Sequence, residues 1–316
     1  MESNTLGRVV LFILSSLSWF YFILPRALKS FLEAGLAWAL KVGGVRANVI
    51  LENIQIAYPG NDSSVRTYRS HLFRLAYVHL GCLFLETLLL LGPIEKHVRK
   101  KGELRGKEHW EFAKTKGKGV IFLASHVGNW ELMAATGAQA GIDIMLVTKH
   151  LKPEWLHQAI KRGRARCGVQ ATYEPKTFRD VIAHLRKNGT VGLVLDQYAG
   201  PPVGIRVPFF GVYVGTNTVL ATLAKRTGAS VLPVLNHRDI SDRCLVEIQP
   251  PVAWKSDPCA VRELAENTAS YTAILEGHIR RYPEQWLWTH KRFKGDLSVL
   301  REGEWSEARP RTGPPR

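Results

Sequence analysis

The chain has 316 residues, about twice the usual length per domain, so it forms one large domain or a compact domain with an appendage. Its composition, 46% hydrophobic and 22% charged, argues against a disordered chain, a collagen-like repeat and a polytopic membrane protein. Lys and Arg (43) exceed Asp and Glu (27) by 16, which indicates an anionic partner: nucleic acid, an acidic protein, a phosphorylated substrate or a membrane surface. The four cysteines are widely scattered, which fits a reducing cytosol and no structural zinc.

The N-terminal segment is strongly apolar. Residues 9–24 carry no charge and would form a helix of roughly 24 Å, slightly short of a hydrocarbon core of about 30 Å. Glu2 and the lack of a small-residue cleavage site after residue 24 argue against a signal peptide. Apolar residues then recur at helical spacing over residues 28–40. We therefore expect a membrane anchor followed by an interfacial amphipathic helix within residues 1–45.

Basic residues flank this anchor unevenly. Arg8 precedes it, whereas four follow it: Arg26, Lys29, Lys41 and Arg46. This asymmetry predicts that the main body lies on the cytoplasmic side of a membrane. The alternative is a helical hairpin that covers the core of a soluble protein, and the sequence does not decide whether residues 9–24 span the bilayer or lie in it.

The remaining chain has the pattern of βαβ units. Residues 71–91 are apolar but interrupted by charge, which predicts a buried helix. From residue 117 onward, short aliphatic runs alternate with amphipathic segments, as in parallel α/β proteins. We expect a central, mostly parallel or mixed sheet flanked by helices, in a main domain of residues 46–300, and a disordered basic tail over residues 301–316. Predicted strands cover residues 119–124, 143–148, 168–172, 190–196, 230–235 and 244–249; predicted helices cover residues 130–139, 153–166, 176–187, 217–226 and 260–281.

The segment SHVGNWE at residues 125–131 is the strongest candidate for chemistry. His126 directly follows a predicted strand, Gly128 allows a tight turn, and Asn129 can cap the helix that Trp130 and Glu131 begin. A carboxylate near one ring nitrogen would fix the tautomer, so that the other nitrogen can take a proton from a substrate hydroxyl. The alternative is a capped helix with a partly exposed histidine.

Other common catalytic motifs are absent from the sequence. It contains no HExxH zinc motif, no GxSxG nucleophile elbow and no GxxxxGK[ST] phosphate loop. None of the cysteines has a local catalytic context. A base with an orienting carboxylate, and no protein nucleophile, is therefore the favoured arrangement.

Four further segments extend this pattern into a family resemblance. SHVGNWELMA resembles the HxxxxD/E block of the glycerolipid and lysophospholipid acyltransferase superfamily, in the branch of the bacterial lipid A late acyltransferases. DQYAG at residues 196–200, VPFFGVYVGTNTVLATLAKRTGASVLPV at 207–234 and RYPEQWLWTHKRFK at 281–294 match that branch in order, and NIQIAYPG at 53–60 is similar to its post-anchor segment. The resemblance covers roughly residues 45–294.

The resemblance implies a membrane-associated α/β acyltransferase of the bacterial inner membrane. It implies transfer of a fatty acyl chain from acyl carrier protein or acyl-coenzyme A to a hydroxyl of a lipid A precursor or another phosphorylated glycolipid or lysophospholipid. By this analogy His126 is the general base and Glu131 its orienting partner, the reaction has no acyl-enzyme intermediate, and no metal or organic cofactor is required. Backbone N–H groups near Gly128 are the candidate oxyanion donors.

The other blocks supply candidate substrate-binding residues, each with a structural alternative. Asp196 and Gln197 follow a strand and could fix a loop or contact the acceptor, while a turn-capping Asp explains the pattern equally well. Phe209 and Phe210 could touch the acyl chain, although packing is the commoner role of adjacent aromatics. The remaining candidates are Thr216 near a helix start, and Lys149, Arg164 and Arg166, a basic group for phosphate or an acidic carrier that could equally be a solvated helix face.

Two alternatives from other functional classes remain at this stage. A non-catalytic membrane-binding relative would keep the anchor and the basic surface without depending on His126 or Glu131. A nucleic-acid-binding protein would also explain the charge, but the sequence has no zinc finger, RNP motif or basic zipper, and the apolar N-terminus favours lipid.

Overall fold

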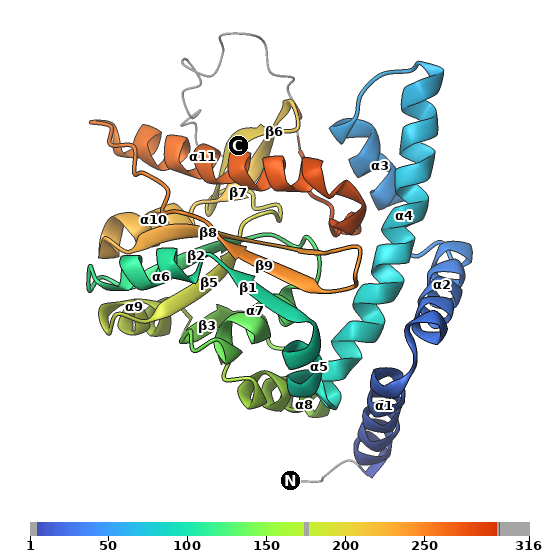
Figure 1. Ribbon diagram of the computed structural model, residues 1–316. Coiled ribbons are helices and arrows are strands. Elements are labelled where there is room, and N and C mark those ends of the chain that lie inside the picture. Colours follow the sequence, from blue (N-terminus) through green and yellow to red (C-terminus); the bar gives the residue numbers. More distant parts are fainter. Residues whose placement is uncertain (1–4, 174–176, 296, 298–316) are drawn as a thin grey trace.

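The computed structural model describes residues 5–173, 177–295 and 297. The predicted tail at residues 301–316 lies outside this range. The described residues form an α/β fold with a helical layer on one side (Figure 1).

The centre of the fold is a seven-stranded sheet with the order β1-β9-β8-β2-β5-β3-β4. Neighbouring strands are parallel except β8 and β9, so the sheet is mixed, as the sequence predicts. The strands are β1 (Gly102–Arg105), β2 (Val120–Ala124), β3 (Ile144–Val147), β4 (Gln170–Thr172), β5 (Thr190–Val194), β8 (Ser230–Arg238) and β9 (Cys244–Ile248).

Alternating side chains of β2 pack into two hydrophobic cores, one on each face of the sheet. Phe122 packs on one face with residues of α5, α7 and the 3-10 helix η1, whereas Ile121 and Leu123 pack on the other with residues of α9, α10 and α11. All five residues of β2 are buried because helices cover both faces, which is why its sequence is apolar throughout. These helices are α5 (Ile94–Lys101), α7 (Trp130–Gln139), α9 (Thr177–Arg186), α10 (Val219–Thr227) and α11 (Ala260–Arg281), together with η1 (Leu88–Leu91). Two further helices, α6 (Lys107–Lys114) and α8 (Glu154–Arg166), also flank the sheet.

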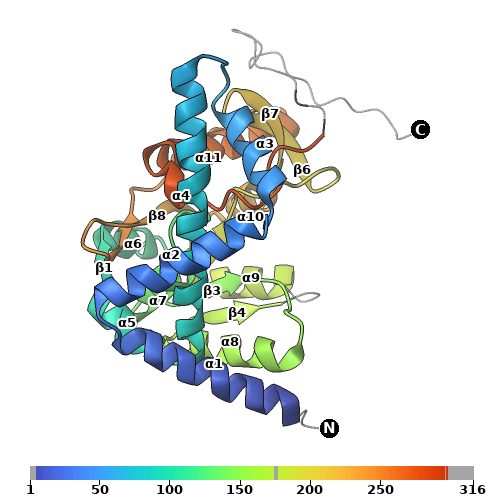
Figure 2. The same cartoon turned by 90° about the vertical axis from the view of Figure 1, so that its right-hand side faces the viewer.

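The first four helices form a separate layer at one side of the sheet (Figure 1). They are α1 (Thr5–Ile23), α2 (Arg26–Val42), α3 (Ala47–Ala57) and α4 (Ser63–Thr87). The long helix α4, which includes most of the segment predicted as a buried helix, lies between α2 and the main body (Figures 1 and 2). By length and composition, α1 and the stretch formed by α4 with η1 could each cross a membrane, but half of the latter is buried within the protein.

Residues 204–217 form a hairpin of β6 (Gly204–Phe209) and β7 (Val212–Asn217). Its two turn residues, Phe210 and Gly211, have φ angles of 52° and 77°. Positive φ at both positions is the geometry of a two-residue hairpin turn, which glycine adopts easily and phenylalanine rarely. Helix α11 is followed by η2 (Pro283–Gln285). The segment after η2 returns to the sheet, where Trp286 forms an isolated bridge with Val127.

Candidate active site

The carboxyl ends of the neighbouring parallel strands β2 and β5 bring His126 and Asp196 together. Ala124 and Val194 are paired in register, so the two residues follow their strands at the same edge. Asp196 Oδ1 lies 2.7 Å from Nδ1 of His126, and Asp196 Oδ2 accepts the backbone N–H of His126 at 2.7 Å. This double contact fixes both the ring and the backbone of His126.

Burial and charge together set the protonation of this pair. Asp196 is 3% exposed, and its Oδ2 also accepts the indole N–H of Trp286 at 2.8 Å. Burial opposes its ionisation, but His126 and these hydrogen bonds lower the pKa of Asp196 to about 2. Burial also opposes protonation of His126, but the charge and hydrogen bond of Asp196 raise its pKa above the ordinary value. The carboxylate therefore accepts from Nδ1–H and leaves Nε2 as the proton acceptor.

The Nε2 side of His126 faces two residues. The side-chain amide nitrogen of Gln197 lies 3.4 Å from Nε2. Trp130 packs its ring edge-to-face on the imidazole, with centroids 4.6 Å apart. Gln197 thus stands where a hydroxyl must approach the base.

Glu131, the expected orienting partner, occupies a different position. Both of its oxygens accept hydrogen bonds from the guanidinium of Arg164, at 2.6 and 2.9 Å, and both side chains are buried. The acid that orients His126 in the structure is Asp196, 70 residues further along the chain. Glu131 acts on His126 through its charge, which helps to raise the histidine pKa.

Several hydrogen bonds fix the turn that follows His126. Asn129 caps α7, as predicted, because its side-chain oxygen accepts the N–H groups of Glu131 and Leu132. Gly128 has a φ of 63°, and a Cβ there would lie 2.6 Å from the side chain of Asn236. Its N–H donates to the carbonyl of Gln285 at 2.9 Å. The N–H groups of Gly128, Glu131 and Leu132 therefore already have acceptors within the protein.

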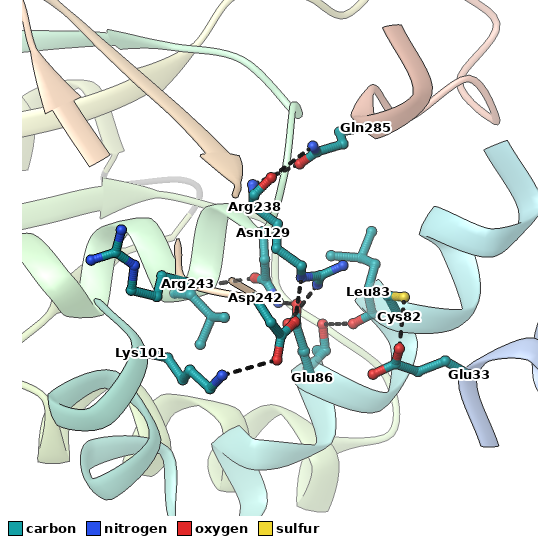
Figure 3. Close-up of polar contacts among 12 residues, drawn as sticks. Glu33, Cys82, Leu83, Glu86, Lys101, Asn129, Arg238, Asp242, Arg243 and Gln285 are labelled. Carbon is teal, nitrogen blue, oxygen red and sulfur yellow. Dashed lines mark hydrogen bonds and ion pairs between the residues drawn. The ribbon is translucent and has the colours of Figure 1, made fainter. Parts of the chain in front are cut away.

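A chain of polar contacts joins this turn to Glu86, Arg238 and Gln285 (Figure 3). Glu86 of α4 accepts from the side-chain amide of Asn129 at 3.1 Å and pairs with Arg238 at 2.5 Å. The backbone N–H of Arg238 donates to Oε1 of Gln285, and Nε2 of Gln285 donates to the backbone carbonyl of Arg238. The backbone carbonyl of Gln285 accepts from the N–H of Gly128. These contacts therefore start at Asn129 and end at Gly128, two consecutive residues of the turn that follows His126.

The segment after η2 contacts His126, Asp196 and Gln197. The mixture of aromatic and basic residues in its sequence did not predict this role. Arg292 is fully buried and donates to the carbonyl groups of Gln197 and Gly215 and to the hydroxyl of Thr216. Thr216 is thus a buried partner of Arg292. At the start of α10, the side-chain oxygen of Asn217 accepts the N–H of Val219. The carbonyl of His126 also accepts from Leu287 N–H at 3.1 Å.

The other predicted substrate-binding residues divide into buried and exposed groups. Arg164 is buried against Glu131, whereas Arg166 is exposed and donates to the carbonyl groups of Leu90 and Gly92. Lys149 is exposed after β3. Phe209 and Phe210 are both buried, at 0% and 3% exposure. Phe210 stacks on Trp286 and lines an open pocket of about 580 Å³ with Tyr58, Tyr68 and Arg280.

Among the described residues, one group has metal-ligating atoms within 4.8 Å of one another: His150, Glu154 and His157. It lies after β3, two strands away from β2 in the sheet order. His150 and Glu154 are exposed, and Lys149 and Lys152 stand beside them in the sequence. The His126–Asp196 pair is not part of this group.

Comparisons with known proteins show the family of the chain. Residues 1–295 match the model of the bacterial lipid A biosynthesis acyltransferase family. A lipid A biosynthesis lauroyltransferase of Escherichia coli is 26% identical over 283 residues, covering 87% of this chain and 88% of the relative. A phosphatidylinositol mannoside acyltransferase of Mycobacterium tuberculosis is 26% identical over 204 residues, covering 63% of this chain and 62% of the relative. The chain belongs to the bacterial lipid A biosynthesis acyltransferase family and is an acyltransferase of glycolipids.

Proposed function

We propose that this enzyme transfers a fatty acyl chain from a thioester donor to a hydroxyl of a lipid A precursor, with His126 as general base. The observation that carries the proposal is the buried His126–Asp196 pair, which holds Nδ1 and leaves Nε2 available. The acceptor follows from the printed activities of the relatives that cover most of the chain. The donor is acyl carrier protein or acyl-coenzyme A, since either anionic carrier suits a net charge of +16.

In this reaction His126 Nε2 takes the proton of the acceptor hydroxyl while its oxygen attacks the thioester carbonyl. The carbonyl oxygen becomes an oxyanion, and the side-chain N–H of Gln197, 3.4 Å from Nε2, is our candidate for its donor. The intermediate then collapses to an ester, the C–S bond breaks, and the imidazolium returns its proton to the leaving sulfur. Asp196 keeps its charge throughout and stabilises the imidazolium.

Three other residues act through their neighbours. We place Glu131 and Arg164 as a buried pair that fixes the start of α7, and Arg292 as the residue that holds the loops carrying Gln197 and Thr216. For Phe209 we propose a packing role, because it has no exposed surface. Phe210 keeps its candidate contact with an apolar part of the substrate because it lines the open pocket.

We further propose that the enzyme works on the cytoplasmic side of the bacterial inner membrane. The support is the apolar helix α1, followed by more basic residues than precede it. A lipid acceptor also stays in the bilayer, so an enzyme bound to the membrane surface encounters the acceptor by diffusion along that surface.

The test is acyl transfer from labelled acyl carrier protein and from acyl-coenzyme A to a panel containing lipid A precursor, a phosphatidylinositol mannoside and a lysophospholipid. Wild type is expected to acylate lipid A precursor, and His126→Ala to lose at least about 10²-fold in kcat with the fold intact. His71→Ala, at an exposed histidine of α4, is the matched control. Undiminished transfer by His126→Ala would refute the proposed base, and acylation of another acceptor in preference would refute the proposed substrate.

A further inference from the structure

The connection between β3 and α8 brings two imidazoles and a carboxylate together outside the catalytic site. His150 lies in this connection, Glu154 is the first residue of α8, and His157 follows on the same helix. These side chains present three ligand atoms that all lie within 4.8 Å of one another. Their spacing, H-x-x-x-E-x-x-H, differs from the HExxH zinc motif, in which both histidines lie on one helix.

Packing holds the two imidazoles in place. The rings of His150 and His157 are stacked, with centroids 3.9 Å apart and an interplanar angle of 28°. Tyr173, which directly follows β4, packs edge-to-face on His157 with a centroid distance of 4.6 Å. Figure 2 shows α8 and β4 side by side at this edge of the sheet. The imidazoles are therefore positioned by contacts with each other and with the end of a neighbouring strand.

The separation of the donor atoms suits a tetrahedral metal ion. Nε2 of His150 lies 3.0 Å from Oε2 of Glu154. Two donors that are each about 2.0–2.1 Å from a tetrahedral zinc ion lie about 3.3 Å apart, so an ion fits between them with little movement. Without a metal ion the same contact is a hydrogen bond, and metal binding would replace its proton.

The third ligand, His157, directs a lone pair toward the same connection. Its Nδ1 accepts the N–H of Leu151, the residue after His150, at 3.4 Å. A hydrogen bond of this length is weak, so coordination by Nδ1 would displace little. Glu154 and His157, three residues apart on α8, project from the same face of the helix.

The donor set selects the kind of metal. Two imidazole nitrogens and one carboxylate oxygen are typical ligands of zinc sites that keep a fourth position for water, whereas magnesium and calcium prefer oxygen ligands alone. Lys149 and Lys152 are exposed beside the group, so solvent and salt screen their repulsion of a cation. We propose that His150, Glu154 and His157 bind one Zn²⁺ ion, with water as the fourth ligand.

A zinc ion here would hold the start of α8. The far end of this helix is fixed by Arg164, which pairs with Glu131 of α7. His157 and Arg164 are seven residues apart and both buried, so they lie on the same side of α8. At the start of the helix, the N-cap residue Pro153 makes no side-chain cap hydrogen bond. The ion would join the first turn of α8 to the connection after β3, at a place separate from the His126–Asp196 pair.

Binding is tested by calorimetric titration of the untagged full-length chain with zinc chloride. A Cys259→Ser background removes the exposed thiol. One Zn²⁺ per chain with a micromolar or lower Kd is expected, and His150→Ala and Glu154→Gln should each weaken binding at least about tenfold. Both side chains are exposed, so both variants should fold as the parent does in metal-free buffer.

The matched control is His71→Ala, at an exposed histidine of α4, which should bind zinc as the parent does. Millimolar Mg²⁺ should not compete, because the donors are mainly nitrogen. No binding at micromolar zinc, or binding unchanged in both ligand variants, would refute the site. Replacement of zinc by Co²⁺ tests the geometry: a strong visible absorption is expected for tetrahedral coordination, and the weak spectrum of an octahedral ion would contradict it.

The proposed role at α8 is tested by hydrogen exchange with and without zinc. Amide exchange over residues 148–157 should slow when zinc is added to the parent, and should be unaffected by zinc in Glu154→Gln. Exchange in α1 serves as the internal reference and should not change. Zinc that binds without slowing exchange at residues 148–157 would show that the ion does not hold the start of α8.

Discussion

At the scale of single residues, two buried carboxylates near His126 have different tasks. Asp196 contacts the imidazole directly, whereas Glu131 is bound at both oxygens by Arg164. A carboxylate with both oxygens held by a guanidinium is poorly placed to respond to a proton moving on the ring. The division predicts that substitutions at Asp196 change the chemistry and that substitutions at Glu131 change mainly the fold.

Asp196→Asn is expected to lower kcat by about 10²–10⁴-fold, because the imidazole loses the carboxylate that fixes its tautomer and stabilises its charge. In wild type, kcat/KM should rise with pH and level off above the pKa of His126, which Asp196 raises. Without the carboxylate the effect of burial dominates and lowers that pKa, so the inflexion of the residual activity should move to lower pH. Glu108→Gln serves as a surface control. An inflexion unchanged in Asp196→Asn would exclude this pairing.

Glu131→Ala is expected to lower the free energy of unfolding by about 3–5 kcal/mol, because it leaves the guanidinium of Arg164 buried without its partner. Replacing both residues by apolar ones, as Glu131→Leu with Arg164→Met, should recover much of this loss. Denaturant unfolding measures both variants, and Glu154→Ala, at an exposed carboxylate of α8, should leave stability unchanged. A single variant as stable as wild type would show that the pair does not hold α7.

At the scale of elements, the N-terminal helical layer contacts the turn that carries His126 through α4. Glu86 is the link, since it holds the capping side chain of Asn129 with one oxygen and Arg238 with the other (Figure 3). Burial opposes ionisation of Arg238, but Glu86 outweighs it and raises the arginine pKa. Helix α4 of the N-terminal layer therefore helps to set the geometry of the turn that carries His126.

Glu86→Ala should lower kcat with little change in KM, because the turn shifts while the groups that bind substrate remain. Glu86→Gln, which can still accept from Asn129, should recover part of the loss. Combined with Asn129→Ala, the effects on stability should be non-additive by about 0.5–3 kcal/mol, as for residues in one network. The control is Glu103→Ala, whose carboxylate pairs with Arg105 and Arg243 at the sheet edge. Strict additivity would show that Glu86 and Asn129 do not cooperate.

The same scale shows which elements the sequence reveals. Strands buried on both faces, such as β2, are predictable because every position is apolar. The edge strand β1, Gly102–Arg105, is not, because two of its four residues are charged and its pairing with β9 joins residues far apart in the sequence. For the same reason His126 and the cap at Asn129 are predictable from a local motif, whereas the contacts of His126 with Asp196 and of Asp196 with Trp286 depend on tertiary pairing.

At the scale of the whole molecule, the charge of +16 is largely separate from the chemistry. The arginines nearest the site, Arg164 and Arg292, are buried in contacts with the protein, so the remaining exposed basic residues form the field that an approaching donor meets. A positive field speeds encounter with an anionic carrier without adding to the catalytic step. The positive charge is therefore expected to raise kcat/KM and to leave kcat unchanged.

Raising the salt concentration from about 50 to about 300 mM shortens the Debye length to below about 8 Å and screens this field. For acyl carrier protein as donor, kcat/KM is expected to fall several-fold over this range, with kcat nearly constant, because only the encounter is weakened. A short, uncharged acyl thioester, assayed with the same detergent-dispersed acceptor, is the control and should show little dependence on salt. An equal decrease with both donors would mean that salt acts on the acceptor or on the enzyme itself, and that the basic surface does not recruit the donor.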